Sequence, residues 1–129
     1  MIRTVLLADD DEKTLELVGA IIGNDGTVQI RAARDGHEAL EIAQEWRPDL
    51  IFLDVIMPKM NGFEVCDTLR RDARTAKIKV VMLTSLLPDP QGHRALGEAE
   101  ADDYITKPFR PVELFRIFER MQGQVTRGE

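Results

Sequence analysis

The chain has 129 residues, a formal net charge of −6 at pH 7, and 43% hydrophobic and 31% charged residues, which is the balance of one ordinary globular domain. The acidic charge argues against a domain that grips nucleic acid through its phosphates, because that kind of binding relies on clustered Lys and Arg. No stretch approaches the ~20 apolar residues that cross a bilayer, and the N-terminus reads as a strand rather than a signal peptide, so we expect a cytoplasmic protein with no membrane contact.

Five short apolar runs along the chain predict β-strands. They occupy residues 5–8, 28–30, 50–53, 80–83 and 103–106. The last run is the weakest of the five, since it contains Asp103 and Thr106 beside its apolar residues.

The segments between these runs carry apolar residues at helical spacing, which predicts amphipathic helices. Their apolar faces contain Leu15, Val18 and Ile22; Ala39, Ile42, Ala43 and Trp46; Val65, Cys66 and Leu69; and Leu114, Phe115, Phe118 and Met121. A further short helix is expected within residues 88–101, carrying Ala95, Leu96 and Ala99. Cys66 is the only cysteine and has no partner for a disulfide or a zinc site, so we expect a free thiol packed on a helix.

Alternating strands and helices predict the α/β class, with right-handed crossovers and a single doubly wound parallel sheet covered by helices on both faces. The nearly continuous apolar character of the strands agrees with burial on both sides. We expect one domain over residues 1–122 and a polar C-terminal tail over residues 123–129. Ligands of such sheets bind beyond the carboxyl ends of the strands, so functional residues are expected directly after strands.

Polar residues do follow four of the predicted strands. They are Asp9 and Asp10, then Asp54, then Thr84 and Ser85, and finally Lys107. A single aspartate after a strand is often only the N-cap of the next helix, and that role suits Asp11. Asp9, Asp10 and Asp54 need another explanation, because two carboxylates about 5 Å apart repel by roughly 3 kcal/mol at an effective dielectric constant near 20.

Two positive partners fit this acidic group. Mg²⁺ prefers hard oxygen ligands and is typically held by one or two carboxylates, waters and phosphate oxygens. The Lys107 ammonium is the second partner, so that one divalent ion and one lysine balance three carboxylates. A carboxylate can itself act as a nucleophile and become an aspartyl phosphate, and we assign that role to Asp54.

Four stretches, in this order, resemble the signatures of the receiver domain of two-component response regulators, including the chemotaxis-type regulators. They read LLADDDE, IFLDVIMPKMNGFEV, VVMLTS and DDYITKPF. The resemblance runs from about residue 4 to residue 118, which is nearly the whole chain, and four ordered motifs are far more specific than any one alone. It implies a flavodoxin-like fold with strand order 2-1-3-4-5.

The resemblance also implies a role for each acidic residue. Asp54 would receive a phosphoryl group from a phosphohistidine on a sensor histidine kinase or histidine phosphotransfer protein, or from a small donor such as acetyl phosphate. Asp10 would bind Mg²⁺ directly, and Asp9 would bind it directly or through water. Asp54 and the backbone carbonyl of Ile56 would complete the protein ligands.

Residues on the later strands would assist the transfer and carry the signal. Lys107 would pair with one phosphoryl oxygen, and Thr84 would swing toward another. Tyr104 would then turn inward behind Thr84, although an aromatic at that position is also explained as part of the core. Pro108 commonly follows a cis peptide bond in this family, and Gly62 matches the small residue that lets the preceding loop turn.

The resemblance implies a signalling domain rather than an enzyme with an external substrate, catalysing only its own phosphorylation and dephosphorylation. Its output partner would bind the face built from the fourth helix, fifth strand and fifth helix. A Mg²⁺-dependent phosphohydrolase is the first alternative, but such enzymes usually carry a second aspartate two residues after the nucleophile, where this chain has Ile56. An unphosphorylated scaffold is the second alternative, and it would not require the acidic residues and lysine to be present.

Two positions bear on the details of that expectation. Glu100 stands where many receivers have a glycine, which puts the backbone of that loop in question. Ile56 and Leu86 flank the expected site, and neither side chain can orient an attacking water, so we predict slow self-dephosphorylation.

Overall fold

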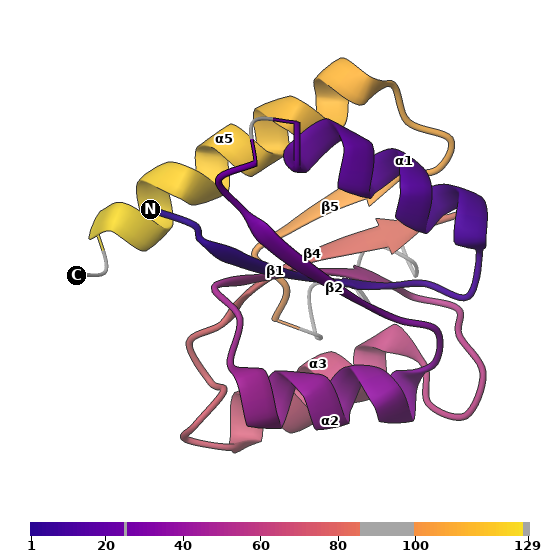
Figure 1. The fold of residues 1–129 in the computed structure, drawn as a ribbon. Coiled ribbons are helices and arrows are strands. Elements are labelled where there is room, and N and C mark those ends of the chain that lie inside the picture. Colours follow the sequence, from indigo (N-terminus) through magenta and orange to yellow (C-terminus); the bar gives the residue numbers. More distant parts are fainter. Residues whose placement is uncertain (25, 86–99, 128–129) are drawn as a thin grey trace.

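A five-stranded parallel sheet forms the centre of the molecule, with the strand order β2-β1-β3-β4-β5 that was predicted (Figure 1). The computed structural model describes residues 1–24, 26–85 and 100–127. Its strands are β1 (Thr4–Ala8), β2 (Gln29–Ala33), β3 (Leu50–Asp54), β4 (Lys79–Thr84) and β5 (Asp103–Thr106).

Helices cover both faces of the sheet, as expected for a doubly wound fold. They are α1 (Glu12–Ile22), α2 (Gly36–Trp46), α3 (Gly62–Arg71) and α5 (Pro111–Arg127). Figure 1 shows α1 and α5 on one face and α2 and α3 on the other. Most of the helix predicted within residues 88–101 lies outside the described residues.

Each face of the sheet packs against its own apolar cluster. Leu7, Phe52 and Val81 point toward α1 and α5, while Leu6, Leu53 and Met82 belong to the cluster beneath α2 and α3. All five residues of β3 are buried because this strand lies in the middle of the sheet. Within residues 1–24, 26–85 and 100–127, none of the helices combines the length and the apolar character that crossing a bilayer requires.

The structure differs from the predicted elements in three details. The second strand begins at Gln29 and runs to Ala33, later than the predicted 28–30, because it pairs in register with the whole of β1. Phe115 is 46% exposed, and Ile117 is buried in its place. The stripe of α5 that faces the core is therefore Leu114, Ile117, Phe118 and Met121, at the i, i+3, i+4, i+7 spacing of one helix face.

The polar residues that follow Gln122 continue α5 as far as Arg127, so this part of the expected tail has helical backbone. The start and the end of the described chain lie close together, because the backbone N–H of Ile2 donates to Gln122 Oε1 over 2.7 Å. Cys66 is a buried cysteine on α3 that forms no disulfide among the described residues, as predicted.

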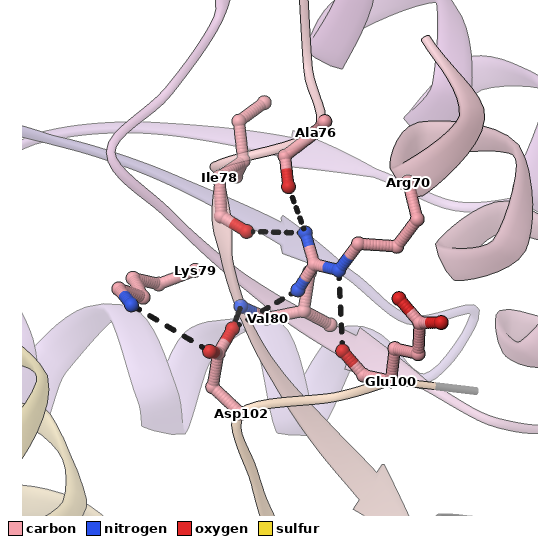
Figure 2. Close-up of polar contacts among 7 residues, drawn as sticks. All are labelled: Arg70, Ala76, Ile78, Lys79, Val80, Glu100 and Asp102. Atoms are coloured by element: carbon pink, nitrogen blue, oxygen red, sulfur yellow. Dashed lines mark hydrogen bonds and ion pairs between the residues drawn. The ribbon is translucent and has the colours of Figure 1, made fainter. Parts of the chain in front are cut away.

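A polar network fixes the amino edge of the sheet, the edge at which the parallel strands begin (Figure 2). The Arg70 guanidinium donates to the backbone carbonyls of Ala76 (3.2 Å), Ile78 (2.7 Å) and Glu100 (3.2 Å). It also donates to the Asp102 carboxylate over 3.0 Å. That carboxylate accepts the backbone N–H of Val80 as well, so one arginine joins α3 to the starts of β4 and β5.

The same network includes Glu100, whose backbone conformation was in question because many receivers have a glycine at this position. Glu100 has φ 57, the left-handed conformation that a glycine adopts at low cost. The backbone of this loop therefore keeps the path that suits glycine, although a glutamate occupies the position. The hydrogen bond from Arg70 Nε to the Glu100 carbonyl helps to hold it there.

Candidate functional site

The predicted site residues converge at the carboxyl edge of the sheet. Asp9 directly follows β1, Asp54 ends β3 and Thr84 ends β4, while Lys107 directly follows β5. The strand register explains the convergence, since Ala8 pairs with Leu53, Asp54 with Leu83, and Thr84 with Thr106. Four segments far apart in the sequence thus end side by side.

Three carboxylates form a tight group at this edge. Asp9, Asp10 and Asp54 each offer an oxygen, and these three oxygens lie within 4.8 Å of one another. Asp9 is only 1% exposed and Asp54 only 6% exposed, whereas Asp10 is exposed. The group therefore has two members inside the protein and one at its mouth.

Lys107 is the cation that contacts the two buried carboxylates. Its Nζ lies 2.6 Å from Asp9 Oδ2 and 3.4 Å from Asp54 Oδ2. Burial alone lowers the pKa of Lys107, but the hydrogen bond to Asp9 and the negative charge of Asp54 outweigh it and raise the pKa. The lysine is thus held in its charged form.

The pKa of Asp54 is strongly shifted from its usual value. Burial first, and then the charge of Asp9, raise the pKa of Asp54 from 3.8 to about 6. The charge of Lys107 and a hydrogen bond from the Ile56 backbone lower the pKa of Asp54, but by less. One lysine is therefore insufficient to compensate this carboxylate.

Asp9 is oriented by its own chain. Its Oδ1 accepts the backbone N–H of Asp11 over 2.9 Å, while its Oδ2 accepts Lys107. Asp11 has the structural role predicted for it, since it is the N-cap of α1 and accepts the backbone N–H of Lys13. Asp11 thus starts the helix, and its two neighbours Asp9 and Asp10 are left for the acidic group.

The donor set fits Mg²⁺. Hard carboxylate oxygens gathered within a few ångströms are what this ion prefers, and a partly open site leaves room for the waters it keeps. Among the described residues, three carboxylates against one ammonium leave an excess of two negative charges, which one divalent cation would balance. The exposed Asp10 gives the group an open side through which a ligand can enter.

The loop between β3 and α3 forms one wall of the site. Gly62 at its far end lies so close to Asp54 that an added Cβ atom would overlap the Asp54 carbonyl oxygen and lie 3.0 Å from its carbonyl carbon. The loop therefore turns where a small residue was expected. Ile56 in this loop is 57% exposed, and its backbone hydrogen-bonds to Asp54.

The remaining predicted residues lie on β4 and β5. Thr84 is buried, and its carbonyl accepts the backbone N–H of Lys107 over 2.7 Å. Tyr104 is half-buried and packs against the cluster beneath α2 and α3. The Lys107–Pro108 peptide bond is cis, in line with the expectation for this family. Leu86, the other predicted neighbour of the site, lies outside the described residues.

Sequence reasoning missed the support of the β3–α3 loop by α2. Gly36, the first residue of α2, donates its backbone N–H to the Pro58 carbonyl, and Asp35 pairs with Lys59 over 3.6 Å. An Asp-Gly pair ahead of the predicted apolar helix face was the available signal, and by itself it indicates a helix cap rather than a contact with the site.

Curated proteins have sequences similar to that of this chain. The chain is 42% identical over 113 residues to the DNA-binding dual master transcriptional regulator RpaA of Synechocystis sp., covering 85% of this chain and 45% of that protein. It is 40% identical over 115 residues to the alkaline phosphatase synthesis transcriptional regulatory protein PhoP of Bacillus subtilis, covering 88% and 46%. The chain thus spans about half the length of these curated relatives.

Solved structures and a family model agree with the sequence relatives. The signal receiver domain of a signal transduction histidine kinase from Syntrophus aciditrophicus superposes with a TM-score of 0.88 at 34% identity, covering 98% of this chain and 95% of that one. The chemotaxis response regulator CheY4 of Vibrio cholerae gives a TM-score of 0.84 at 30% identity, covering 94% and 99%. The family model for the response regulator receiver domain matches residues 5–119. The ordered motifs, the sheet topology and the acidic edge have one common explanation: this chain belongs to the response regulator receiver domain family.

Proposed function

We propose that Asp54 is the phosphoacceptor of this receiver and takes its phosphoryl group from a phosphohistidine on a sensor histidine kinase or histidine phosphotransfer protein. The observation that carries the proposal is the sharing of one lysine by two buried carboxylates, with Lys107 2.6 Å from Asp9 and 3.4 Å from Asp54. A site built this way has an excess of negative charge until a cation binds. With a divalent cation bound the charges would balance, and the cation and Lys107 would face an incoming phosphoryl group.

Asp54 is a better nucleophile than Asp9. Each oxygen of Asp9 accepts a short hydrogen bond, from the Asp11 backbone at 2.9 Å and from Lys107 at 2.6 Å, which suits an oriented ligand. Asp54 is held more loosely by Lys107, and its pKa, raised from 3.8 to about 6, marks a carboxylate more basic than an ordinary aspartate. Greater basicity favours attack on phosphorus.

In the proposed transfer, an Asp54 carboxylate oxygen forms a bond to phosphorus as the bond from phosphorus to the histidine nitrogen breaks. The electron pair of the broken bond stays on the imidazole, and the product is an acyl phosphate on Asp54. Lys107 and the Thr84 hydroxyl donate to phosphoryl oxygens. Mg²⁺ bound by Asp9, Asp10, Asp54 and the Ile56 carbonyl would neutralise charge on those oxygens.

Phosphorylation adds ~1.5 to 2 negative charges at this edge, which draws Thr84 and Lys107 toward the new oxygens. These two residues end neighbouring strands and are joined by a backbone hydrogen bond, so β4 and β5 respond together. Tyr104 on β5 then relays the change toward an output face that includes β5 and α5. We propose a DNA-binding output protein or domain as the partner, since relatives about twice as long are named as DNA-binding regulators.

The proposed phosphoryl group is long-lived. Ile56 lies two residues after Asp54, where a phosphohydrolase would carry its second carboxylate, and its side chain is apolar and 57% exposed. It has no group that aligns an attacking water. A half-life of only seconds with Mg²⁺ present would contradict slow self-dephosphorylation and favour the phosphohydrolase alternative.

The test is incubation with acetyl phosphate and Mg²⁺, followed by intact mass measurement. The native protein is expected to gain one phosphoryl group, and Asp54→Asn none. Asp67→Asn, which alters an exposed carboxylate on α3, is the matched control and should label like the native protein. A label that survives in Asp54→Asn would place the nucleophile elsewhere.

A further inference from the structure

The first residue of α2 touches the loop that follows Asp54. A Cβ atom added to Gly36 would overlap the carbonyl oxygen of Met60 and lie 2.6 Å from both the carbonyl carbon and the Cβ of that residue. The Gly36 backbone N–H also donates to the Pro58 carbonyl over 3.3 Å. Only a residue without a side chain allows the helix start and the loop backbone to approach this closely.

Two glycines thus hold the second half of the loop. At its far end Gly62 fits against the Asp54 carbonyl, and its N–H donates to the Val55 carbonyl over 2.8 Å. In the middle, Lys59 has φ 70, and Met60 donates its N–H to the Pro58 carbonyl over 2.7 Å. The path of this loop is set by these contacts rather than by a regular secondary structure.

The loop carries backbone atoms that belong to the site. The Ile56 backbone hydrogen-bonds to Asp54, and the Ile56 carbonyl is a ligand in the proposed Mg²⁺ set. A displacement of the loop at Met60 therefore changes the geometry beside Asp54. We propose that Gly36 is a positioning residue of the phosphoacceptor site: by lacking a Cβ atom it lets α2 hold the β3–α3 loop where Ile56 can serve Asp54 and the cation. This inference rests on the proposed function.

A side chain at residue 36 would move the loop rather than the helix. α2 is fixed to the sheet through Ala39 and Ala43, which are 1% and 0% exposed. Its first turn is capped by Asp35, which accepts the Glu38 N–H over 2.8 Å. In the loop, by contrast, Pro58 and Lys59 are exposed, and Met60, which the added Cβ would meet, is only partly buried where it packs on the core. The less buried partner yields, so strain introduced at Gly36 reaches Ile56.

The experiment compares Gly36→Ala with Gly19→Ala by calorimetric titration with Mg²⁺ and by thermal unfolding without Mg²⁺. Gly19 lies on α1, where an added Cβ would make an ordinary contact 3.8 Å from Leu7. Gly36→Ala is expected to raise the dissociation constant for Mg²⁺ about tenfold or more, since losing a contact that orients metal ligands typically costs ~10- to 100-fold in metal affinity. Gly19→Ala should stay within about twofold of the native value, because it displaces nothing near the site.

A merely structural role for Gly36 would lower the unfolding temperature and leave the Mg²⁺ affinity of the folded protein unchanged, which would overturn the inference. If Gly36→Ala does not fold, Lys59→Val and Lys59→Gly decide it, because Lys59 is exposed and lies in the same loop. Valine disfavours φ 70 and glycine accepts it, so Lys59→Val should bind Mg²⁺ more weakly. Equal affinities for this pair would contradict the inference. A native protein that neither binds Mg²⁺ nor takes up the label would instead refute the proposed function.

Discussion

The two edges of the sheet use acidic residues in opposite ways. At the amino edge, Asp102 accepts the Val80 N–H and Arg70, and lies 3.7 Å from Lys79. Asp49 on the same edge accepts the backbone N–H groups of Arg3 and Thr4. At the carboxyl edge, three clustered carboxylates face one lysine.

The difference separates structural from functional carboxylates. A partly exposed charge whose hydrogen bonds are completed costs the fold little, but a buried charge that is under-compensated destabilises the protein until a ligand arrives. The pKa of Asp54, raised to about 6 by burial and by Asp9, is the sign of that deficit. The amino edge is thus complete by itself, whereas the carboxyl edge has an excess of negative charge that the proposed cation would balance.

The largest stability effect is expected at the amino edge, from Arg70→Ala. Removing the guanidinium takes one donor from the Asp102 carboxylate and leaves the carbonyls of Ala76, Ile78 and Glu100 without this donor, so the free energy of unfolding should fall by about 3 kcal/mol. Urea unfolding measures the change. Arg74→Ala is the control, since Arg74 is exposed and pairs only with Asp72 among the described contacts; it should unfold like the native protein. An equal loss of unfolding free energy in both variants would contradict a stabilising role for the Arg70 network.

At the carboxyl edge, removing a charged side chain is expected to raise the free energy of unfolding rather than lower it. Because the pKa of Asp54 is higher in the folded protein than its usual 3.8, the native state binds the proton more tightly than the unfolded state. The stability that the Asp54 proton contributes to the folded protein is therefore lost as pH rises from about 4 to about 6. Asp54→Asn without Mg²⁺ should raise the free energy of unfolding at pH 7.5 by on the order of 2 kcal/mol, and by less at pH 5. If Asp54→Asn is less stable than the native protein at pH 7.5, the Asp54 charge is not under-compensated in the folded protein.

Mg²⁺ affinity provides a third test of the same deficit. The cation binds the ionised carboxylate, so its affinity should increase as pH rises toward and through the Asp54 pKa of about 6, then level off. Below that pKa the affinity should fall by up to about tenfold per pH unit, because the ion must displace a proton. Calorimetric titration from pH 5 to pH 8 measures it. A flat profile across this range would mean that Asp54 does not contribute a titrating ligand.

The smallest effect is expected at Glu100. Its φ of 57 is unfavourable for a residue with a side chain, and Glu100→Gly should therefore stabilise the protein by up to about 1 kcal/mol. Glu100→Ala keeps the Cβ atom and the same strain, so it is the control that should show no gain. Thermal unfolding of the two variants distinguishes them. A gain that is equal in both would assign the effect to loss of the carboxylate instead.

The residues of the functional edge could be found in the sequence because they follow strands. Once alternating apolar runs predict a parallel sheet, the residues after each run must meet at one edge, and this identified Asp9, Asp54, Thr84 and Lys107. The helix faces were predicted less accurately. Phe115 and Ile117 are both apolar, and only the packing of α5 on the sheet decided which one is buried.

The sequence by itself indicated the alternation of strands and helices, the acidic group and its lysine, because periodicity and motif order are local properties of the chain, while the strand order followed from the resemblance to receiver domains. Tertiary structure decided the contacts that join distant segments: Arg70 with Glu100 and Asp102, and Gly36 with Met60. Those contacts depend on the distances and angles at which helices pack on the sheet. No spacing along the chain encodes them, so they emerge only when the packed core fixes where each backbone lies.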